Sequence, residues 1–363
     1  MRYYTVLILA VLSLTIVACS DSGSTFSNSP RPKEEVEWLI PDDEVFAAGP
    51  GKDGIPSIDH PNYVTASDDQ GKLDWLDDND LILGIKIGEE IRGYPHPLLD
   101  WHEIINDDFG PTSVAITYCP LTGTGIGWNR TINGEKTTFG VSGLLYNSNL
   151  MPYDRVTDSY WSQMRLDCVS GEMIGLKART YQLVELPWRL WRQWFPNAKV
   201  VAEGINGFAR PYDIYPYGNY KTQPDTYYPV NRADDNRRPD KERVLGLSIN
   251  GKVLVYTFAS FQRKEIDIQS NFFQGEKIIV FGSENKNFMA AYYSKLEDGT
   301  PVSSFEPIQN KNAVLARDSL GNEWNIFGEA VSGPFKGMRL RRTGAIMGYW
   351  FTWPSFYEDI ELF

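Results

Sequence analysis

Residues 83–94 read LGIKIGEEIRGY, and residues 245–256 read LGLSINGKVLVY. Each stretch has alternating apolar residues, passes through a turn that contains glycine, and then alternates again, which is typical of a β-hairpin. Both stretches begin with Leu-Gly and end with Tyr. A hairpin that returns within one chain predicts an internal duplication, and this duplication decides how the rest of the sequence is divided.

Further matching blocks follow the two hairpins in the same order. Residues 154–161 (DRVTDSYW) correspond to residues 318–324 (DSLGNEW), which are one residue shorter. The motif VSG, with a glycine four residues after it, occurs at residues 169–175 and again at 331–337. The spacing stays within a residue or two of 162 throughout. We therefore expect one copy over about 79–200 and a second over about 242–360.

Strand signals dominate each copy, and the helical signals are short. Ser113–Tyr118 (SVAITY) and Thr137–Tyr146 are the clearest strands of the first copy. A helix is predicted over Pro187–Phe195, where proline suits the first turn and tryptophan recurs every three residues on a face suited to core packing. Leu98–Asn106 (LLDWHEIIN) predicts a second short helix. The expected fold class is a β-rich α+β fold, internally duplicated, with two related lobes and short helices.

The N-terminus carries a predicted export signal. Residues 1–18 place one arginine before an apolar run of about a dozen residues, with a small residue just before Cys19. The ending Ile-Val-Ala-Cys resembles a bacterial lipobox, which implies cleavage before Cys19 and attachment of lipid to its sulfur. Residues 19–35 are polar and rich in Ser and Pro, as in a flexible tether. We expect a lipid-anchored protein of the bacterial cell envelope, in the outer membrane by analogy, because serine follows Cys19.

The remaining chain divides into three parts. The first repeat with its lead-in spans residues 36–202, a connecting segment rich in Tyr, Pro, Asn and Asp spans 203–241, and a degenerate second repeat spans 242–363. The chain has 47 acidic and 35 basic residues and a net charge of −12, which argues against a nucleic-acid partner. The membrane, through the lipid anchor, is the only partner that the sequence indicates, and a small-molecule or protein partner remains open.

The two copies can be compared with each other to find residues present in only one of them. Asp154 and Trp161 have counterparts in the second copy, so we expect them to serve the shared architecture. His102 and Cys119 have no such counterparts. In the second copy, Glu265 occupies the position that corresponds to His102, and Gly282 or Ser283 the position that corresponds to Cys119. We therefore expect a site in the first copy around His102 and Cys119.

Three stretches carry a resemblance to a known family. They are WHEIIND (101–107), TYCPLTG (117–123) and SNLMPYD (148–154) followed by Trp161, and they resemble the family of domain of unknown function 3179 from about Asp53 to the C-terminus. The resemblance supports a site at His102 and Cys119 and implies no particular activity. The family often has a second cysteine or another residue where Thr122 stands here, so a Cys-x-x-Cys redox motif is not available.

Several chemistries remain open for this site, and the first is a metal centre. Imidazole and thiolate suit copper or zinc. Two ligands are too few, and further candidate ligands are His96, Met151, Asp154 and His60. Whether the protein is an enzyme stays undecided at this point.

A second reading makes Cys119 a nucleophile, with His102 as its base and either Asn106 or Asp107 orienting the imidazole. The glycines at 123, 125 and 127 can then bring backbone N–H groups near a reacting oxygen. A third reading pairs Cys119 with Cys168 in a disulfide. In the last reading the thiol is inert and the protein is a non-catalytic module that binds a glycan or a protein.

Overall fold

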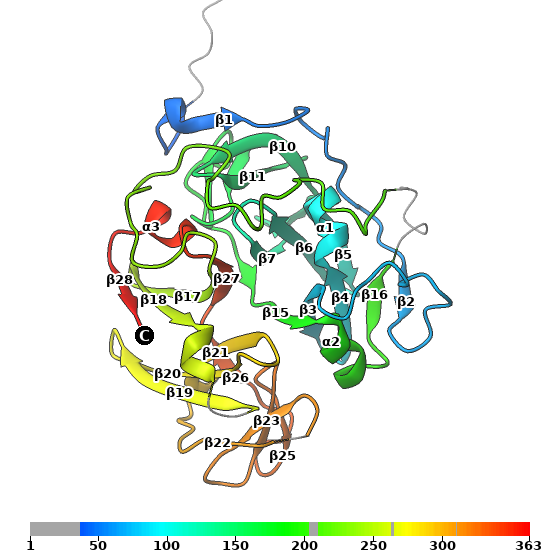
Figure 1. Cartoon of the computed structure of the whole chain (residues 1–363), viewed down its shortest axis with the longest axis vertical. Helices are drawn as coiled ribbons and strands as arrows, with labels where there is room; N and C mark the ends of the chain where they lie inside the picture. The colour runs from blue at the N-terminus through cyan, green and yellow to red at the C-terminus, as the bar shows by residue number, and fades with distance from the viewer. Residues whose placement is uncertain (1–36, 203–209, 263–264, 310) are drawn as a thin grey trace, which may run out of the picture. The chain divides into compact units, whose positions relative to one another are not determined.

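The computed structural model describes residues 37–202, 210–262, 265–309 and 311–363 (Figure 1). The expected signal peptide, Cys19 and nearly all of the tether lie outside the described residues. Within the described part of the chain, no helix is long and apolar enough to cross a membrane. A short 3-10 helix, η1 (Asp42–Glu44), opens the described chain.

The predicted first hairpin organises one sheet of the first half. β3 (Leu81–Ile87) and β4 (Glu90–Pro95) pair antiparallel, with Gly84 opposite Gly93. β15 (Val184–Pro187) adds to β3, and β16 (Lys199–Val201) runs parallel to β4 with β2 (Tyr63–Thr65) beyond it. Two helices follow strands of this sheet: α1 (His96–His102) comes after β4, and α2 (Trp188–Trp194) after β15.

Two further sheets complete the first half. One has the order β14 (Thr180–Tyr181), β7 (Thr124–Asn129), β6 (Thr112–Cys119), β5 (Ile104–Phe109). The other has the order β1 (Val45–Ala47), β10 (Phe139–Tyr146), β11 (Asn149–Asp154), β12 (Tyr160–Ser162), β13 (Asp167–Ser170). A small hairpin of β8 (Thr131–Ile132) and β9 (Glu135–Lys136) closes at the turn formed by Asn133 and Gly134.

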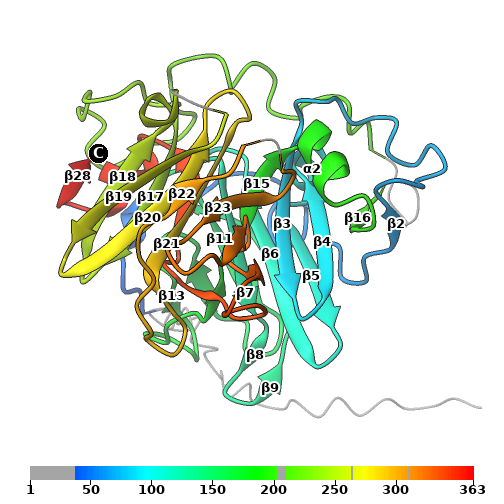
Figure 2. The ribbon, with the colours of Figure 1, turned by 90° about the horizontal axis from the view of Figure 1, so that it is seen from below.

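The second half has three sheets with a corresponding strand order, but its first and third sheets have four strands where those of the first half have five. Its first sheet is β27 (Ile346–Tyr349), β17 (Arg243–Ile249), β18 (Lys252–Thr257), β28 (Ile360–Leu362). The second is β26 (Leu340–Arg342), β21 (Phe288–Leu296), β20 (Glu276–Ser283), β19 (Asp267–Phe273), and the third is β22 (Glu306–Pro307), β23 (Val314–Arg317), β24 (Glu323–Asn325), β25 (Ala330–Ser332). The short helices are η2 (Phe258–Phe261) and α3 (Thr352–Phe356). The shared order is consistent with the duplication inferred from the sequence, and in Figure 2 the second-half strands β17–β20 and β28 lie on the left while the first-half strands β2–β5 lie on the right.

The β-rich class and the helix after Pro187 are confirmed, but the prediction for Leu98–Asn106 is wrong in part. The helix begins earlier, at His96, and ends at His102. Glu103 takes a positive φ of 56°, which a continuing right-handed helix cannot accommodate. Ile104 and Ile105 then pair with β6, where β-branched side chains are favoured.

The Leu-Gly pair that opens each hairpin has a packing reason. A Cβ added to Gly84 would lie 2.2 Å from the ring of Trp191 in α2. In the second half, a Cβ on Gly246 would lie 2.2 Å from the ring of Trp353 in α3. Only glycine leaves room for these indoles, so the same residue recurs at both positions.

Each of these helices packs into the core of the opposite half. Trp191 and Trp194 of α2 belong to the hydrophobic cluster that contains Trp324 of the second half. Trp353 of α3 belongs to the cluster that contains Trp161 of the first half. Phe356 of α3 packs edge to face on Tyr146 of β10, and Trp194 of α2 packs in the same way on Phe288 of β21. The two halves therefore share their cores reciprocally.

Candidate functional site

The main chain brings His102 and Cys119 near each other, as the sequence predicts, but their side chains contact different groups. The Tyr118 N–H donates to the Glu103 carbonyl over 2.7 Å, which joins the end of α1 to β6. The Cys119 thiol faces the Ser148 carbonyl at 3.6 Å. The His102 ring lies 2.7 Å from the Pro56 carbonyl through Nδ1 and 2.8 Å from the Tyr212 hydroxyl through Nε2.

Burial keeps both groups in their neutral forms. Desolvation, and then the nearby Glu103 carboxyl, raise the pKa of Cys119 to about 11. Desolvation lowers the pKa of His102 to about 4. A thiol nucleophile needs the opposite shift, because the thiolate is its reactive form.

The second cysteine, Cys168, is also buried, and both Cys119 and Cys168 are free thiols rather than a disulfide. The Cys168 thiol donates to the Tyr160 carbonyl over 3.3 Å, and burial raises its pKa to about 11. This arrangement agrees with a packed residue, as its alanine counterpart Ala330 suggests.

The other predicted metal ligands are dispersed. Met151 is fully buried in an apolar cluster with Ile40 and Val169. His96 lies 3.0 Å from the Glu185 carboxylate, and His60 is exposed. Among the described residues, no three His, Cys, Asp or Glu side chains gather closely enough to hold a metal ion.

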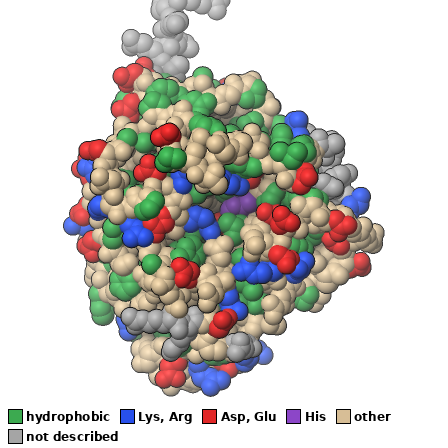
Figure 3. Space-filling view, in the orientation of Figure 1, with side chains coloured by type: hydrophobic (Ala, Val, Ile, Leu, Met, Phe, Trp, Pro, Cys, Tyr) green, Lys and Arg blue, Asp and Glu red, His purple; other side chains and the backbone are tan. Residues whose placement is uncertain are grey.

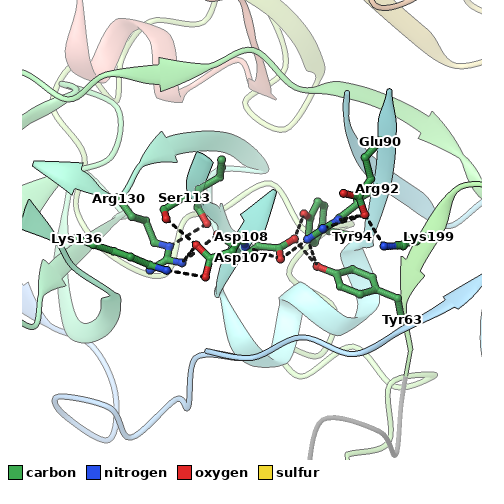
Figure 4. A network of polar contacts seen from close by, with 11 residues as sticks. Tyr63, Glu90, Arg92, Tyr94, Asp107, Asp108, Ser113, Arg130, Lys136 and Lys199 are labelled. Carbon is green, nitrogen blue, oxygen red and sulfur yellow. Dashed lines mark hydrogen bonds and ion pairs between the residues drawn. The ribbon is translucent and has the colours of Figure 1, made fainter. Parts of the chain in front are cut away.

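Asn106 and Asp107, the predicted partners of the imidazole, make other described hydrogen bonds. The Asn106 amide donates to the Asp59 carboxylate over 2.7 Å and to the Phe139 carbonyl over 2.8 Å. Asp107 accepts from the guanidinium of Arg92 and the hydroxyls of two tyrosines, Tyr63 and Tyr94 (Figure 4). These bonds tie β5 to the neighbouring elements.

Asp154 and Trp161 have the architectural role that their presence in both copies indicates. Asp154 accepts a bond from the Thr157 N–H over 2.8 Å and one from the Trp161 indole over 3.1 Å. The second half repeats the indole bond at the same 3.1 Å, from Trp324 to Asp318. An aspartate that satisfies backbone N–H groups in a turn stabilises that turn.

A buried polar cluster at α1 is the part of the site that sequence reasoning largely missed. His96 and Asp100 are four residues apart on one helical face, and both are buried. His96 contacts Glu185 of β15, and Glu185 also binds the guanidinium of Arg243 from the second half. Asp100 binds Lys221 of the connecting segment through Oδ2 over 3.0 Å, while its buried Oδ1 has no hydrogen-bond partner among the described residues.

The three carboxyls of this cluster differ in their electrostatics. Burial by itself would raise the pKa of Glu185, but Arg243 and His96 outweigh it and lower that pKa to about 2. Burial raises the pKa of Asp100, although Lys221 opposes the shift. Burial also raises the pKa of Glu103 to about 7, even though Glu103 accepts a 2.8 Å bond from the Tyr217 hydroxyl.

A cavity of about 320 Å³ lies against α1 at this cluster. Its walls carry carboxylates, one lysine and aromatic rings: Asp74, Asp77, Asp80, Asp100, Asp213, Lys221, Trp75, Tyr212 and Tyr215. Figure 3 shows a small histidine surface near the middle of the face that it draws, with basic and acidic side chains around it.

The second half lacks the charged groups of the cluster. Glu185 pairs with Leu83 in the first half, and Met347 pairs with Leu245 in the same register of the second. By the repeat spacing, Phe258 of the second half likewise corresponds to His96, and Gln262 corresponds to Asp100. The comparison that selected His102 and Cys119 can therefore also find this cluster.

These features define a β-rich protein with two halves of similar strand order, in which the buried polar site is built mainly from the first half. A family model described as a protein of unknown function, DUF3179, matches residues 52–360, so the chain belongs to the DUF3179 family. This confirms the resemblance carried by the three stretches around Cys119. No curated protein and no solved structure matches the chain.

Proposed function

We propose that the protein is a lipid-anchored protein of the bacterial cell envelope that binds a small organic cation in the cavity next to α1. The envelope location is supported by the signal-like residues 1–18 and by Cys19. The binding role develops the reading of the protein as a non-catalytic module. It assigns that module a small-molecule ligand rather than a glycan or a protein.

The observation that carries the proposal is that Asp100 is buried at the cavity with one carboxylate oxygen lacking a hydrogen-bond partner among the described residues. Its side chain is 3% exposed, it lines the cavity, and its Oδ1 has no hydrogen-bond partner among the described residues. A buried carboxylate oxygen without a partner is costly, and a cationic ligand would supply the missing donor. The cavity, at about 320 Å³, is at the small end of the range for ligand sites.

Lys221 already makes the kind of contacts with Asp100 and Tyr215 that a cationic ligand would make. Its ammonium group lies 3.0 Å from Asp100 Oδ2 and 3.9 Å from the centre of the Tyr215 ring. An ammonium held between a carboxylate and an aromatic face gains from both the ion pair and the ring quadrupole. Trp75 and Tyr212 extend the aromatic wall beyond Lys221.

The thiol and metal readings have weaker support. The raised pKa of Cys119 disfavours a thiolate. The described contacts of His102 and of Cys119 go to separate partners. A bound copper or zinc ion would require these side chains and a third ligand to be rearranged.

The binding proposal is tested by calorimetric titration of the full-length protein with 2-naphthylmethylammonium. We expect Asp100→Asn to weaken binding of the ammonium probe about tenfold or more, since it removes a charged acceptor. Asp78→Asn, which changes an exposed neighbour that does not line the cavity, should have no effect. Lys221→Met should strengthen binding, because it frees Asp100 from an internal competitor.

The pH dependence of the affinity has a defined sign. Burial raises the pKa of both Asp80 and Asp100, so these carboxyls take up protons at a higher pH than free aspartate. Affinity for the ammonium probe should therefore fall as the pH is lowered through the mildly acidic range. The absence of saturable binding of the ammonium probe, or binding of this probe that is indifferent to Asp100→Asn, would refute the cation site.

The anchor is tested separately by metabolic labelling with a radioactive fatty acid. We expect the label to be incorporated into the wild-type protein and to be lost in Cys19→Ser. Labelling that persists in the variant would contradict the lipid anchor and leave the ligand proposal intact.

A further inference from the structure

A second cavity, also of about 320 Å³, lies in the first half away from the acidic one. Its aromatic wall is formed by Trp128, Phe139 and Trp161, whose rings meet edge to face with centroids 5.4 to 6.0 Å apart. These three side chains are almost completely buried. The cavity therefore reaches the core of the first half.

The second half explains why this cavity exists. Thr180 pairs with Trp128 in the first half, and Arg342 pairs with Tyr292 in the second, so Thr180 and Arg342 are equivalent positions. Two residues before each of them, Ala178 therefore corresponds to Leu340. Leu340 is fully buried in the core of its own half, whereas Ala178 lines the cavity. A smaller side chain thus leaves open in the first half the space that leucine occupies in the second.

The two halves also differ in whether the buried polar group at this position has a hydrogen-bond partner. Tyr292, in the second half, donates its hydroxyl to the Ile326 carbonyl over 2.7 Å. Trp128, its counterpart, has a buried indole N–H with no hydrogen-bond partner among the described residues. Buried N–H groups normally have an acceptor, so this indole needs one that the described chain does not supply.

The charge of the lining is basic. Lys177 and Arg179 are exposed residues of the lining, and among the described residues no acidic side chain lines the cavity. Lys177 binds Asp167 over 2.8 Å, so its charge is already balanced. Arg179 has no ion pair within the described part of the chain, which makes its guanidinium the available partner for an anion.

We propose that this cavity binds a small carboxylate with an apolar or aromatic body. The apolar body would occupy the space beside Ala178, against the rings of Trp128 and Trp161. The carboxylate would face Arg179, which can bind it through two parallel N–H donors. This ligand is opposite in charge to the one that the acidic cavity would bind, and the proposal does not depend on that cavity.

The test is calorimetric titration of the full-length protein with 2-naphthoate. We expect saturable binding of one naphthoate per chain. Ala178→Leu, which copies the second half, should abolish it. Arg179→Gln should weaken it about tenfold, and Arg341→Gln, a change to the corresponding arginine of the second half, should leave it unchanged.

The variants separate this site from the acidic one. Asp100→Asn should leave naphthoate binding intact, and Ala178→Leu should leave binding of 2-naphthylmethylammonium intact. If Ala178→Leu fails to fold, Arg179→Gln on the surface still decides the question. The proposal is overturned by the absence of saturable naphthoate binding, by affinity that is unchanged in Arg179→Gln, or by an equal loss in Arg341→Gln.

Discussion

The two halves of the molecule share a strand order and differ in the chemistry of their interiors. In the first half, Gln163 accepts a bond from Thr124 over 2.7 Å and donates one to Thr117 over 2.9 Å, all of them buried. The strand registers show that Phe288 of the second half corresponds to Thr124 of the first half. In the same way, Phe281 corresponds to Thr117. Ile326 takes the place of Gln163, two residues after the shared tryptophan.

This difference shows which features the fold requires. Contacts that recur in both halves, such as the Asp-to-Trp bonds and the Gly-to-Trp packing, maintain the architecture. The polar interior, the cluster at α1 and the aromatic cavity occur in the first half at positions where the second half has apolar or larger residues. The second half therefore serves as an internal reference, and any function of the protein is best sought where the first half departs from it.

The largest expected effect comes from separating the halves. Because α2 packs into the second core and α3 into the first, neither residues 37–202 nor residues 242–363 should fold alone. We expect each fragment to show the circular dichroism of an unfolded chain, with no cooperative thermal transition. A fragment that unfolds cooperatively would show that the reciprocal packing is dispensable.

The two tryptophans that pack on the hairpin glycines should contribute equally to stability. Trp191→Ala and Trp353→Ala each remove an indole packed on a glycine of the hairpin in its own half, and each should lower the free energy of unfolding by about 3–5 kcal/mol. Chemical denaturation measures both values. A difference of several kcal/mol between the variants would mean that one half dominates stability, which would weaken the comparison.

The buried acid of the first half should make stability depend on pH. Burial raises the pKa of Glu103 from 4.5 to about 7, so between these values the unfolded chain has lost a proton that the folded chain retains. Stability should therefore fall as the pH rises through this window, by about 3 kcal/mol, and then level off. Glu103→Gln should flatten this fall.

Glu265, from the second half, is the matched control for that measurement. It is partly exposed and binds Lys286 over 2.8 Å. Glu265→Gln should leave the pH profile of stability unchanged. A profile that is flat in the wild-type protein would contradict the burial of Glu103.

The smallest expected effect on stability comes from replacing a buried polar residue of the first half by its apolar counterpart in the second half. Gln163→Ile copies the second half but leaves the hydroxyls of Thr117 and Thr124 without their amide partner. It should cost about 1–3 kcal/mol. Replacing both threonines and Gln163 together by their apolar counterparts should recover part of this loss, since the two hydroxyls are then absent and the Asn149 amide still donates to Thr122 over 2.9 Å. A single variant as stable as the wild type would show that the network contributes little.

Much of the fold follows from local signals in the sequence. The alternation around the Gly-containing turns predicted the hairpins, and Pro187 with the tryptophans after it predicted α2. The end of α1 was missed because LLDWHEIIN has helical periodicity up to the point where Glu103 adopts a left-handed conformation. Nothing in the local pattern indicates that this residue leaves the helix.

The site was predicted less completely than the fold. Comparison of the repeats directed attention to His102 and Cys119, and the main chain does bring them near each other. The same comparison marks His96, Asp100 and Glu185, but their burial and pairing depend on Lys221 and Arg243 from distant parts of the chain. Sequence spacing does not reveal such partners.

The sequence by itself determined the β-rich class and the family, and it predicted the duplication, because these rest on repeated local patterns and on short motifs. The tertiary structure decided which polar side chains are buried, how their pKa values shift, and where cavities open. These properties arise from contacts between residues as far apart as Glu185 and Arg243, or from a difference as small as Ala178 in place of leucine. Burial and electrostatics are properties of the assembled core, and they exist only once the two halves have packed into each other.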